Sequence, residues 1–144
     1  MSFNYNQVSS TNLNFQLLRL IDQYKKHGRI IIAYDIDDTV RPYYCATCTD
    51  IQSLIRLAKS ALNAYLIVYT SNPDIEEIKK FLDKEEIPYD SINENAPFVH
   101  YKTGKVFYNI LLDDKAGLAQ AASNLKDLIY IVQNNLIDRG DSNE

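Results

Sequence analysis

The chain has 144 residues, of which 46% are hydrophobic and 24% are charged, a composition that fits a single globular domain with one core. The net charge of −4 gives no general attraction to nucleic acid or anionic membranes, which disfavours a nucleic-acid partner but leaves it open, since a local basic patch is compatible with this net charge. No apolar run approaches the roughly 18 residues that span a bilayer, and no signal peptide is recognisable. We therefore expect a cytoplasmic protein with no membrane partner, as one domain over residues 1–144 with flexible tails at 1–10 and 138–144.

Helical and strand patterns alternate along the chain. In order, we expect a helix over 11–27, a strand over 29–34, a helix over 50–63, a strand over 65–69, a helix from Pro73, a strand over 87–92, a loop over 93–104, a strand over 109–112 and a helix over 115–134. This alternation predicts an α/β fold of three layers, Rossmann-like, with a mainly parallel central sheet and helices on both faces. In such sheets ligands bind beyond the carboxyl ends of the strands.

Local signals mark several helix ends. Gly28 is expected to stop the first helix, and Thr49 with Gln52 matches a capping box at the start of the second. Asn72 before Pro73 matches the N-cap of the third helix.

Polar side chains follow three of the predicted strands. The first strand leads into Asp35, Asp37, Asp38 and Thr39, the second into Thr70 and Ser71, and the last into Asp113 and Asp114, with Lys105 shortly before it. Converging carboxylates repel one another, and a divalent cation such as Mg²⁺ relieves that repulsion. Hydroxyls at a helix N-terminus suit a phosphate, and a Lys neutralises its remaining charge. The set indicates a metal-and-phosphate site with one carboxylate as nucleophile.

Four motifs in this order resemble those of the haloacid dehalogenase superfamily. "DIDDTV" resembles the first motif, Asp-x-Asp-x-Thr after an apolar strand; "LIVYT" resembles the second, Lys105 the third, and "ILLDD" the fourth. The resemblance spans roughly residues 30–128. It implies an enzyme, a Mg²⁺-dependent phosphohydrolase (phosphatase) that acts on a phosphomonoester through an aspartyl-phosphate. The substrate is not named by the sequence.

The resemblance also implies roles for the acidic residues. Asp35 would attack phosphorus, and Asp37 would protonate the leaving group and then activate water. The metal site would consist of Asp35, the backbone carbonyl of Asp37, Asp113 and Asp114. For Asp38 we expect no chemistry, only a side chain that caps the loop.

The expected phosphate contacts include two open choices. Thr70 would hold a phosphate oxygen, with Ser71 as the alternative residue. Lys105 would pair with Asp35 and the phosphate, with Lys102 as the alternative. Arg41 either contacts the substrate phosphate or packs its loop onto the body of the protein.

The expected connections beside the site are short. Neither residues 40–49 nor residues 93–104 can fold as the cap domain that many members of the resembled family carry. The resemblance therefore implies a capless member with an open site, which suits a large substrate or a lid from a second copy of the chain. The sequence leaves open whether the protein is a homo-oligomer.

Two features allow other interpretations. Cys45 and Cys48 form a C-x-x-C pair, but no second pair completes a zinc site. The favoured interpretation is that both are small residues of a loop, and a redox role is left open. The acid-rich pattern also occurs in signalling receiver domains, although there the acidic pair precedes the other motifs. A catalytically silent phosphate- or metal-binding domain is the remaining alternative.

Overall fold

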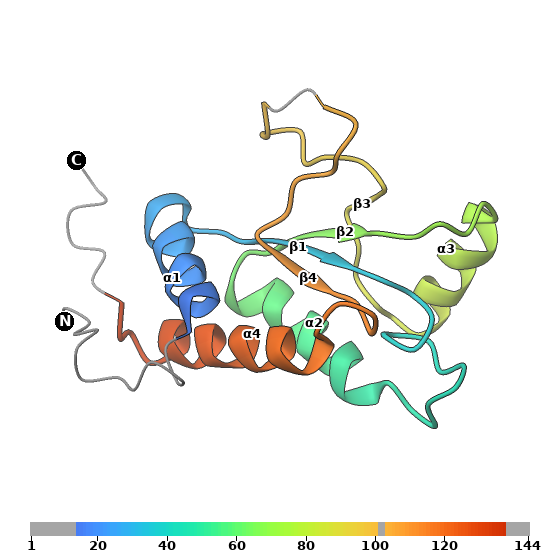
Figure 1. Cartoon of the computed structure of the whole chain (residues 1–144), viewed down its shortest axis with the longest axis horizontal. Coiled ribbons are helices and arrows are strands. Elements are labelled where there is room, and N and C mark those ends of the chain that lie inside the picture. Colours follow the sequence, from blue (N-terminus) through green and yellow to red (C-terminus); the bar gives the residue numbers. More distant parts are fainter. Residues whose placement is uncertain (1–13, 101–102, 138–144) are drawn as a thin grey trace.

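The computed structural model describes residues 14–100 and 103–137 (Figure 1). Its elements in chain order are α1 (Phe15–His27), β1 (Ile31–Tyr34), α2 (Thr49–Ala61), β2 (Tyr65–Val68), α3 (Ile75–Lys84), β3 (Ser91–Ile92), β4 (Ile110–Leu112) and α4 (Leu118–Gln133). Each expected element is present, with its ends displaced by a few residues. The expected tails at 1–10 and 138–144, and the first residues of the first expected helix, lie outside the described residues.

The four strands form one parallel sheet in the order β3-β2-β1-β4. The chain therefore runs from β1 through β2 to β3 at one edge, and then crosses to β4 on the other side of β1. The expected α/β, Rossmann-like fold of three layers without a cap is confirmed. The reversal of strand order places the switch point between β1 and β4, where parallel sheets of this kind bind their ligands.

The two faces of the sheet are covered differently (Figure 1). The larger core cluster joins strand residues such as Ile32 and Leu66 to the buried apolar side chains of all four described helices. The smaller cluster, on the opposite face, joins Ile31, Ala33 and Ile67 to the connection between β3 and β4. The expectation of helices on both faces is met on one face only: among the described residues, no helix contributes to the smaller cluster, and the layer on that face is an irregular connection. Apolar residues of the β3–β4 connection cover the second face instead: Ala96, Val99, Val106, Phe107 and Tyr108.

The helix ends follow the expected signals only in part. Gly28 ends α1 in the left-handed region at φ 69°, as expected. The prediction of a capping box at Thr49 is wrong. Cys48 is the N-cap of α2, and its side chain makes no capping hydrogen bond. The side chain of Gln52 is used elsewhere, since its Nε2 donates a 2.7 Å hydrogen bond to the carbonyl of Val40. This bond ties the loop after β1 to α2.

The connections beside the carboxyl ends of the strands are irregular loops. Within the described residues, neither the loop over 35–48 nor the connection over 93–109 forms a separate domain.

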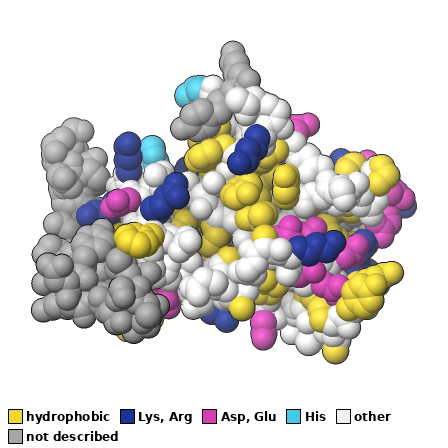
Figure 2. Space-filling model, in the orientation of Figure 1, with side chains coloured by type: hydrophobic (Ala, Val, Ile, Leu, Met, Phe, Trp, Pro, Cys, Tyr) yellow, Lys and Arg dark blue, Asp and Glu magenta, His cyan; other side chains and the backbone are white. Residues whose placement is uncertain are grey.

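Figure 2 shows acidic and basic side chains intermingled on the face drawn. In the part of the chain that the structure describes, no helix has the length and apolar character to cross a membrane.

Candidate functional site

Three carboxylates meet at the switch point between β1 and β4. Asp35 directly follows β1, and Asp113 and Asp114 directly follow β4. The backbone N–H of Asp35 donates a 2.9 Å hydrogen bond to the carbonyl of Leu112, which holds the two strand ends side by side. One oxygen from each of the three carboxylates lies within 4.8 Å of the others, and over residues 14–100 and 103–137 no other group of three His, Cys, Asp or Glu side chains is so arranged. We call these three residues the acidic cluster.

Thr39 connects the two halves of the acidic cluster. Its side chain is fully buried. Its hydroxyl donates to Oδ2 of Asp35 at 3.5 Å and accepts a 3.1 Å hydrogen bond from the backbone N–H of Asp114. No role was expected for Thr39 individually, although it is the Thr of the Asp-x-Asp-x-Thr motif. The motif was the available signal, but the contact with Asp114 depends on a segment 75 positions away in the sequence.

The carboxyl group of Asp35 is partly buried beside two other acids. Burial raises the pKa of Asp35 to about 6, and the charges of Asp113 and Asp114 add to this effect, while a hydrogen bond from the backbone N–H of Ile36 opposes it. Since like charges at this separation disfavour full ionisation, the cluster holds a proton in mildly acidic solution unless a cation compensates the charge. A divalent cation bound here would offset this concentration of negative charge.

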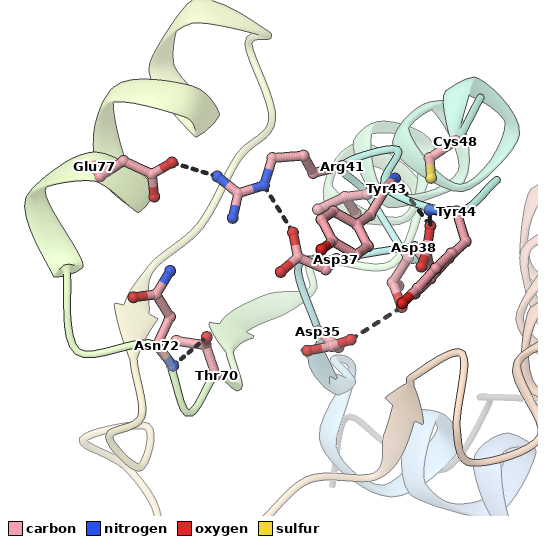
Figure 3. Close-up of polar contacts among 12 residues, drawn as sticks. Asp35, Asp37, Asp38, Arg41, Tyr43, Tyr44, Cys48, Thr70, Asn72 and Glu77 are labelled. Carbon is pink, nitrogen blue, oxygen red and sulfur yellow. Dashed lines mark hydrogen bonds and ion pairs between the residues drawn. The ribbon is translucent and has the colours of Figure 1, made fainter. Parts of the chain in front are cut away.

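The side chain of Asp37 is directed toward Arg41, which in turn reaches Glu77 on α3 (Figure 3). Its Oδ1 accepts a 2.8 Å hydrogen bond from Nε of Arg41, and Nη1 of Arg41 donates a 2.6 Å bond to Oε1 of Glu77. The Arg41 guanidinium also lies 5.4 Å from the ring centroid of Phe81. Of the two alternatives for Arg41, this arrangement corresponds to packing of the loop, here onto α3. The expected metal contact of Asp37 was through its backbone carbonyl, and its side chain is not part of the cluster.

Asp38 holds the loop that follows β1, as expected. It lies in the left-handed region at φ 61°, which Asp tolerates better than most residues. Its Oδ1 accepts hydrogen bonds of 2.9, 2.7 and 3.0 Å from the backbone N–H groups of Tyr43, Tyr44 and Cys45. These bonds lower the pKa of Asp38. The structure thus gives Asp38 the role of a loop cap.

Thr70 lies beyond the end of β2, in a short turn. Its hydroxyl accepts a 3.1 Å hydrogen bond from the N–H of Asn72, and its backbone N–H and carbonyl both bond to the side chain of Asn93. Asn72 is not the helix N-cap that we expected. Asp74 takes that position, and Asn72 instead accepts a hydrogen bond from the N–H of Asp74. Ser71 is exposed beside this turn, so both hydroxyls stay candidates for a phosphate.

The structure does not bring Lys105 to the acidic cluster. Asn109 bonds to the backbone of Ile31 through its own N–H and its Oδ1, which places the chain before β4 at the opposite, amino end of β1. Lys105 lines an open cavity along α1 and β4. Among the ion pairs of the described residues, none includes Lys105. The alternative residue, Lys102, lies outside the described residues.

The arrangement combines three carboxylates that could hold a cation, a buried hydroxyl that contacts both strand ends, and a fourth carboxylate that Arg41 holds in the adjacent loop. Comparison of the chain with protein-family models, with curated proteins and with solved structures found no match.

Proposed function

We propose that this protein is a Mg²⁺-dependent phosphohydrolase that cleaves a phosphomonoester through an aspartyl-phosphate on Asp35. The observation that carries the proposal is the meeting of Asp35, Asp113 and Asp114 at the switch point of a parallel sheet. This is where α/β folds bind ligands. The resemblance of the four sequence motifs to the haloacid dehalogenase superfamily supports the same chemistry.

The acidic cluster fits a small divalent cation. Mg²⁺ binds one or two carboxylates and completes its coordination with water and phosphate oxygens. Three carboxylate oxygens within 4.8 Å of one another, one of them on a residue with a raised pKa, are a suitable donor set. Asp35, Asp113 and Asp114 would hold the cation. When bound, the cation would supply positive charge that offsets the negative charge of the cluster and the phosphate.

The proposed reaction uses two aspartates. An oxygen of Asp35 forms a bond to phosphorus while the bond between phosphorus and the ester oxygen of the substrate breaks, and Asp37 donates a proton to that leaving oxygen. Asp37 then accepts a proton from water as the water oxygen attacks phosphorus, which releases phosphate and restores the Asp35 carboxylate. Arg41 bonds to Oδ1 of Asp37. Within the described residues, the hydrogen bonds leave Oδ2 available for both proton transfers.

Other residues would bind the phosphate oxygens. The hydroxyl of Thr70 or Ser71 is proposed for one of them, since both residues follow β2, the strand adjacent to β1. The role of Lys105 toward phosphate rests on the resemblance alone, because Lys105 lies elsewhere. A phosphate contact of Arg41 rests only on its place in the loop after β1, because its guanidinium binds Asp37 and Glu77.

The proposal is tested with the full chain and p-nitrophenyl phosphate. We expect hydrolysis in the presence of Mg²⁺, loss of hydrolysis with EDTA, and recovery when excess Mg²⁺ is restored. Asp35→Asn should reduce kcat by roughly a thousandfold or more, because an amide cannot be the nucleophile. Asp127→Asn is the matched control, since Asp127 is exposed on α4 and the change in charge is the same.

The outcomes separate the proposal from its alternatives. Full activity in EDTA, or in the Asp35→Asn variant, would refute the mechanism. A phosphoryl group that stays on Asp35 for hours after treatment with acetyl phosphate, without turnover, would indicate a receiver-like domain. Mg²⁺ binding without hydrolysis of any of a panel of phosphorylated metabolites would indicate a catalytically silent domain.

A further inference from the structure

Two thiols lie close together in the loop after β1. The Sγ atoms of Cys45 and Cys48 are 3.3 Å apart, and both cysteines are free. A disulfide has an S–S bond of about 2.05 Å, so closure requires the sulfurs to approach by little more than 1 Å. Cys45 is exposed to solvent and Cys48 is buried. They are the only cysteines in the sequence, so a measurement of the protein's thiols follows these two residues alone.

The backbone brings this pair together by two independent contacts. The N–H of Cys45 is bonded to Oδ1 of Asp38, which fixes one end of the pair. Cys48 is the N-cap of α2, and the first helical bond, from the N–H of Gln52 to the carbonyl of Cys48 at 3.0 Å, fixes the other. Figure 3 shows Cys48 and Asp38 on neighbouring parts of the loop. Hydrogen bonds at both ends of the segment from Cys45 to Cys48 therefore hold the two sulfur atoms close together.

A metal does not explain the pair. A structural zinc site needs about four ligands. Within residues 14–100 and 103–137, the groups of three or more His, Cys, Asp and Glu side chains able to share an ion do not include Cys45 or Cys48. Two sulfurs at this distance, one exposed and one buried, suit thiol–disulfide exchange instead.

We propose that Cys45 and Cys48 are a dithiol site that a small-molecule disulfide, such as glutathione disulfide, converts reversibly to an intramolecular disulfide. The Cys45 thiolate attacks one sulfur of the oxidant, forming a mixed disulfide and releasing one glutathione thiolate. The Cys48 sulfur then attacks Sγ of Cys45 and releases the second glutathione. The two protein thiols lose two electrons and two protons, and the oxidant leaves as two molecules of glutathione.

The environment of the two sulfurs determines the order of attack. Burial raises the pKa of the Cys48 thiol to about 12, and the adjacent Cys45 sulfur and the charges of Asp38 and Asp114 contribute. Cys48 is thus neither accessible nor readily ionised, so Cys45 reacts with the oxidant first. The disulfide would join the loop over 38–45 covalently to the start of α2, next to the acidic cluster. The proposal does not depend on the proposed phosphatase activity.

The test uses the full reduced chain and glutathione disulfide, with no phosphate substrate. We expect the number of titratable thiols to fall from two to none, the mass to fall by two hydrogen atoms, and the protein to run as a monomer on a non-reducing gel. Dithiothreitol should restore both thiols. The thermal midpoint should be higher in the oxidised form, because the cross-link restricts the unfolded chain.

Single substitutions provide the controls. Cys48→Ser should stop at the mixed disulfide on Cys45, with one bound glutathione. Cys45→Ser should keep its thiol, since Cys48 is buried. Three results would overturn the proposal: a mixed disulfide that persists in the wild-type chain, a disulfide-linked dimer, or two thiols that survive oxidant concentrations sufficient to modify the Cys48→Ser variant.

Discussion

A single hydroxyl group links the two acidic strand ends of this protein. Thr39 has no exposed surface, and its Oγ1 lies between Oδ2 of Asp35 and the backbone N–H of Asp114. Asp35 and Asp114 lie far apart in the sequence, so the relative position of their carboxylates depends on this contact as well as on the pairing of β1 with β4. At the residue scale, Thr39 therefore holds the carboxylates of the cluster in position without contributing a carboxylate itself.

Thr39→Val tests this role, because Val keeps the shape of the side chain and removes the hydroxyl. We expect the free energy of unfolding to fall by about 1–3 kcal/mol, since the N–H of Asp114 loses its partner. Urea unfolding measures the change, and Thr39→Ser is the control that retains the hydroxyl. The thermal stabilisation by Mg²⁺ should persist in the Ser variant and weaken in the Val variant. An unchanged Mg²⁺ response in Thr39→Val would show that the hydroxyl does not position the cluster.

The loop between β1 and α2 is organised around one side chain. Asp38 accepts three backbone N–H bonds, from Tyr43, Tyr44 and Cys45. The rings of Tyr43 and Tyr44 are exposed, so burial of apolar surface contributes little to the order of this segment. At the element scale, residues 43–45 are held mainly by hydrogen bonds, whereas Ile36 and Val40 anchor the start of the same loop in the apolar core.

Asp38→Ala should loosen the loop, because it removes the acceptor of all three bonds and places Ala at φ 61°. We expect faster hydrogen exchange at the amides of residues 43–45 and a lower thermal midpoint. Asp38→Asn is the matched control: its side chain keeps an acceptor oxygen, and Asn tolerates the left-handed region. Equal exchange rates in the Ala variant and the wild type would show that another contact holds the loop.

Some element boundaries were predictable and others were not. Gly28 ends α1 through its own left-handed backbone conformation, and the prediction of a helix end there is confirmed. The capping box at Thr49 failed because Gln52 bonds to Val40, a residue of the preceding loop. Asn72 failed as an N-cap because Asp74 satisfies the N–H of Glu77 at the start of α3. In both failures a competing partner took the bond that the local pattern predicted.

At the scale of the whole molecule, the sheet brings like charges together. Asp35, Asp113 and Asp114 are adjacent because β1 and β4 are neighbours, and burial with this repulsion raises the pKa of Asp35 from 3.8 to about 6. A pKa that is higher in the folded chain means that the folded state holds a proton which the unfolded chain releases. The contribution of Asp35 to stability is therefore present below about pH 4 and is lost as pH rises through about 6.

This linkage predicts how Mg²⁺ acts on stability. A cation binds the ionised carboxylate, so its stabilising effect should be small near about pH 5 and larger near about pH 7.5. Thermal midpoints with and without Mg²⁺ at both pH values measure it. Asp35→Asn should raise the metal-free midpoint at the higher pH and remove most of the Mg²⁺ effect. A Mg²⁺ effect in the variant equal to that of the wild type would contradict a site on this cluster.

The sequence by itself determined the α/β class, the parallel sheet, and the position of the acids at strand ends. These follow from apolar patterns and turn residues within short windows, where the chain's own periodicity decides the outcome. The loop-capping role of Asp38 belongs to the same group, because its partners lie within seven positions.

Only the tertiary structure decided which polar groups meet. The contact of Thr39 with Asp114, the pairing of Arg41 with Glu77, and the placement of Lys105 away from the cluster each depend on packing between segments far apart in sequence. The same holds for the sheet face covered by the β3–β4 connection rather than by a helix. Such contacts are selected by the shape and hydrogen bonding of the assembled core, for which a local sequence pattern carries no information.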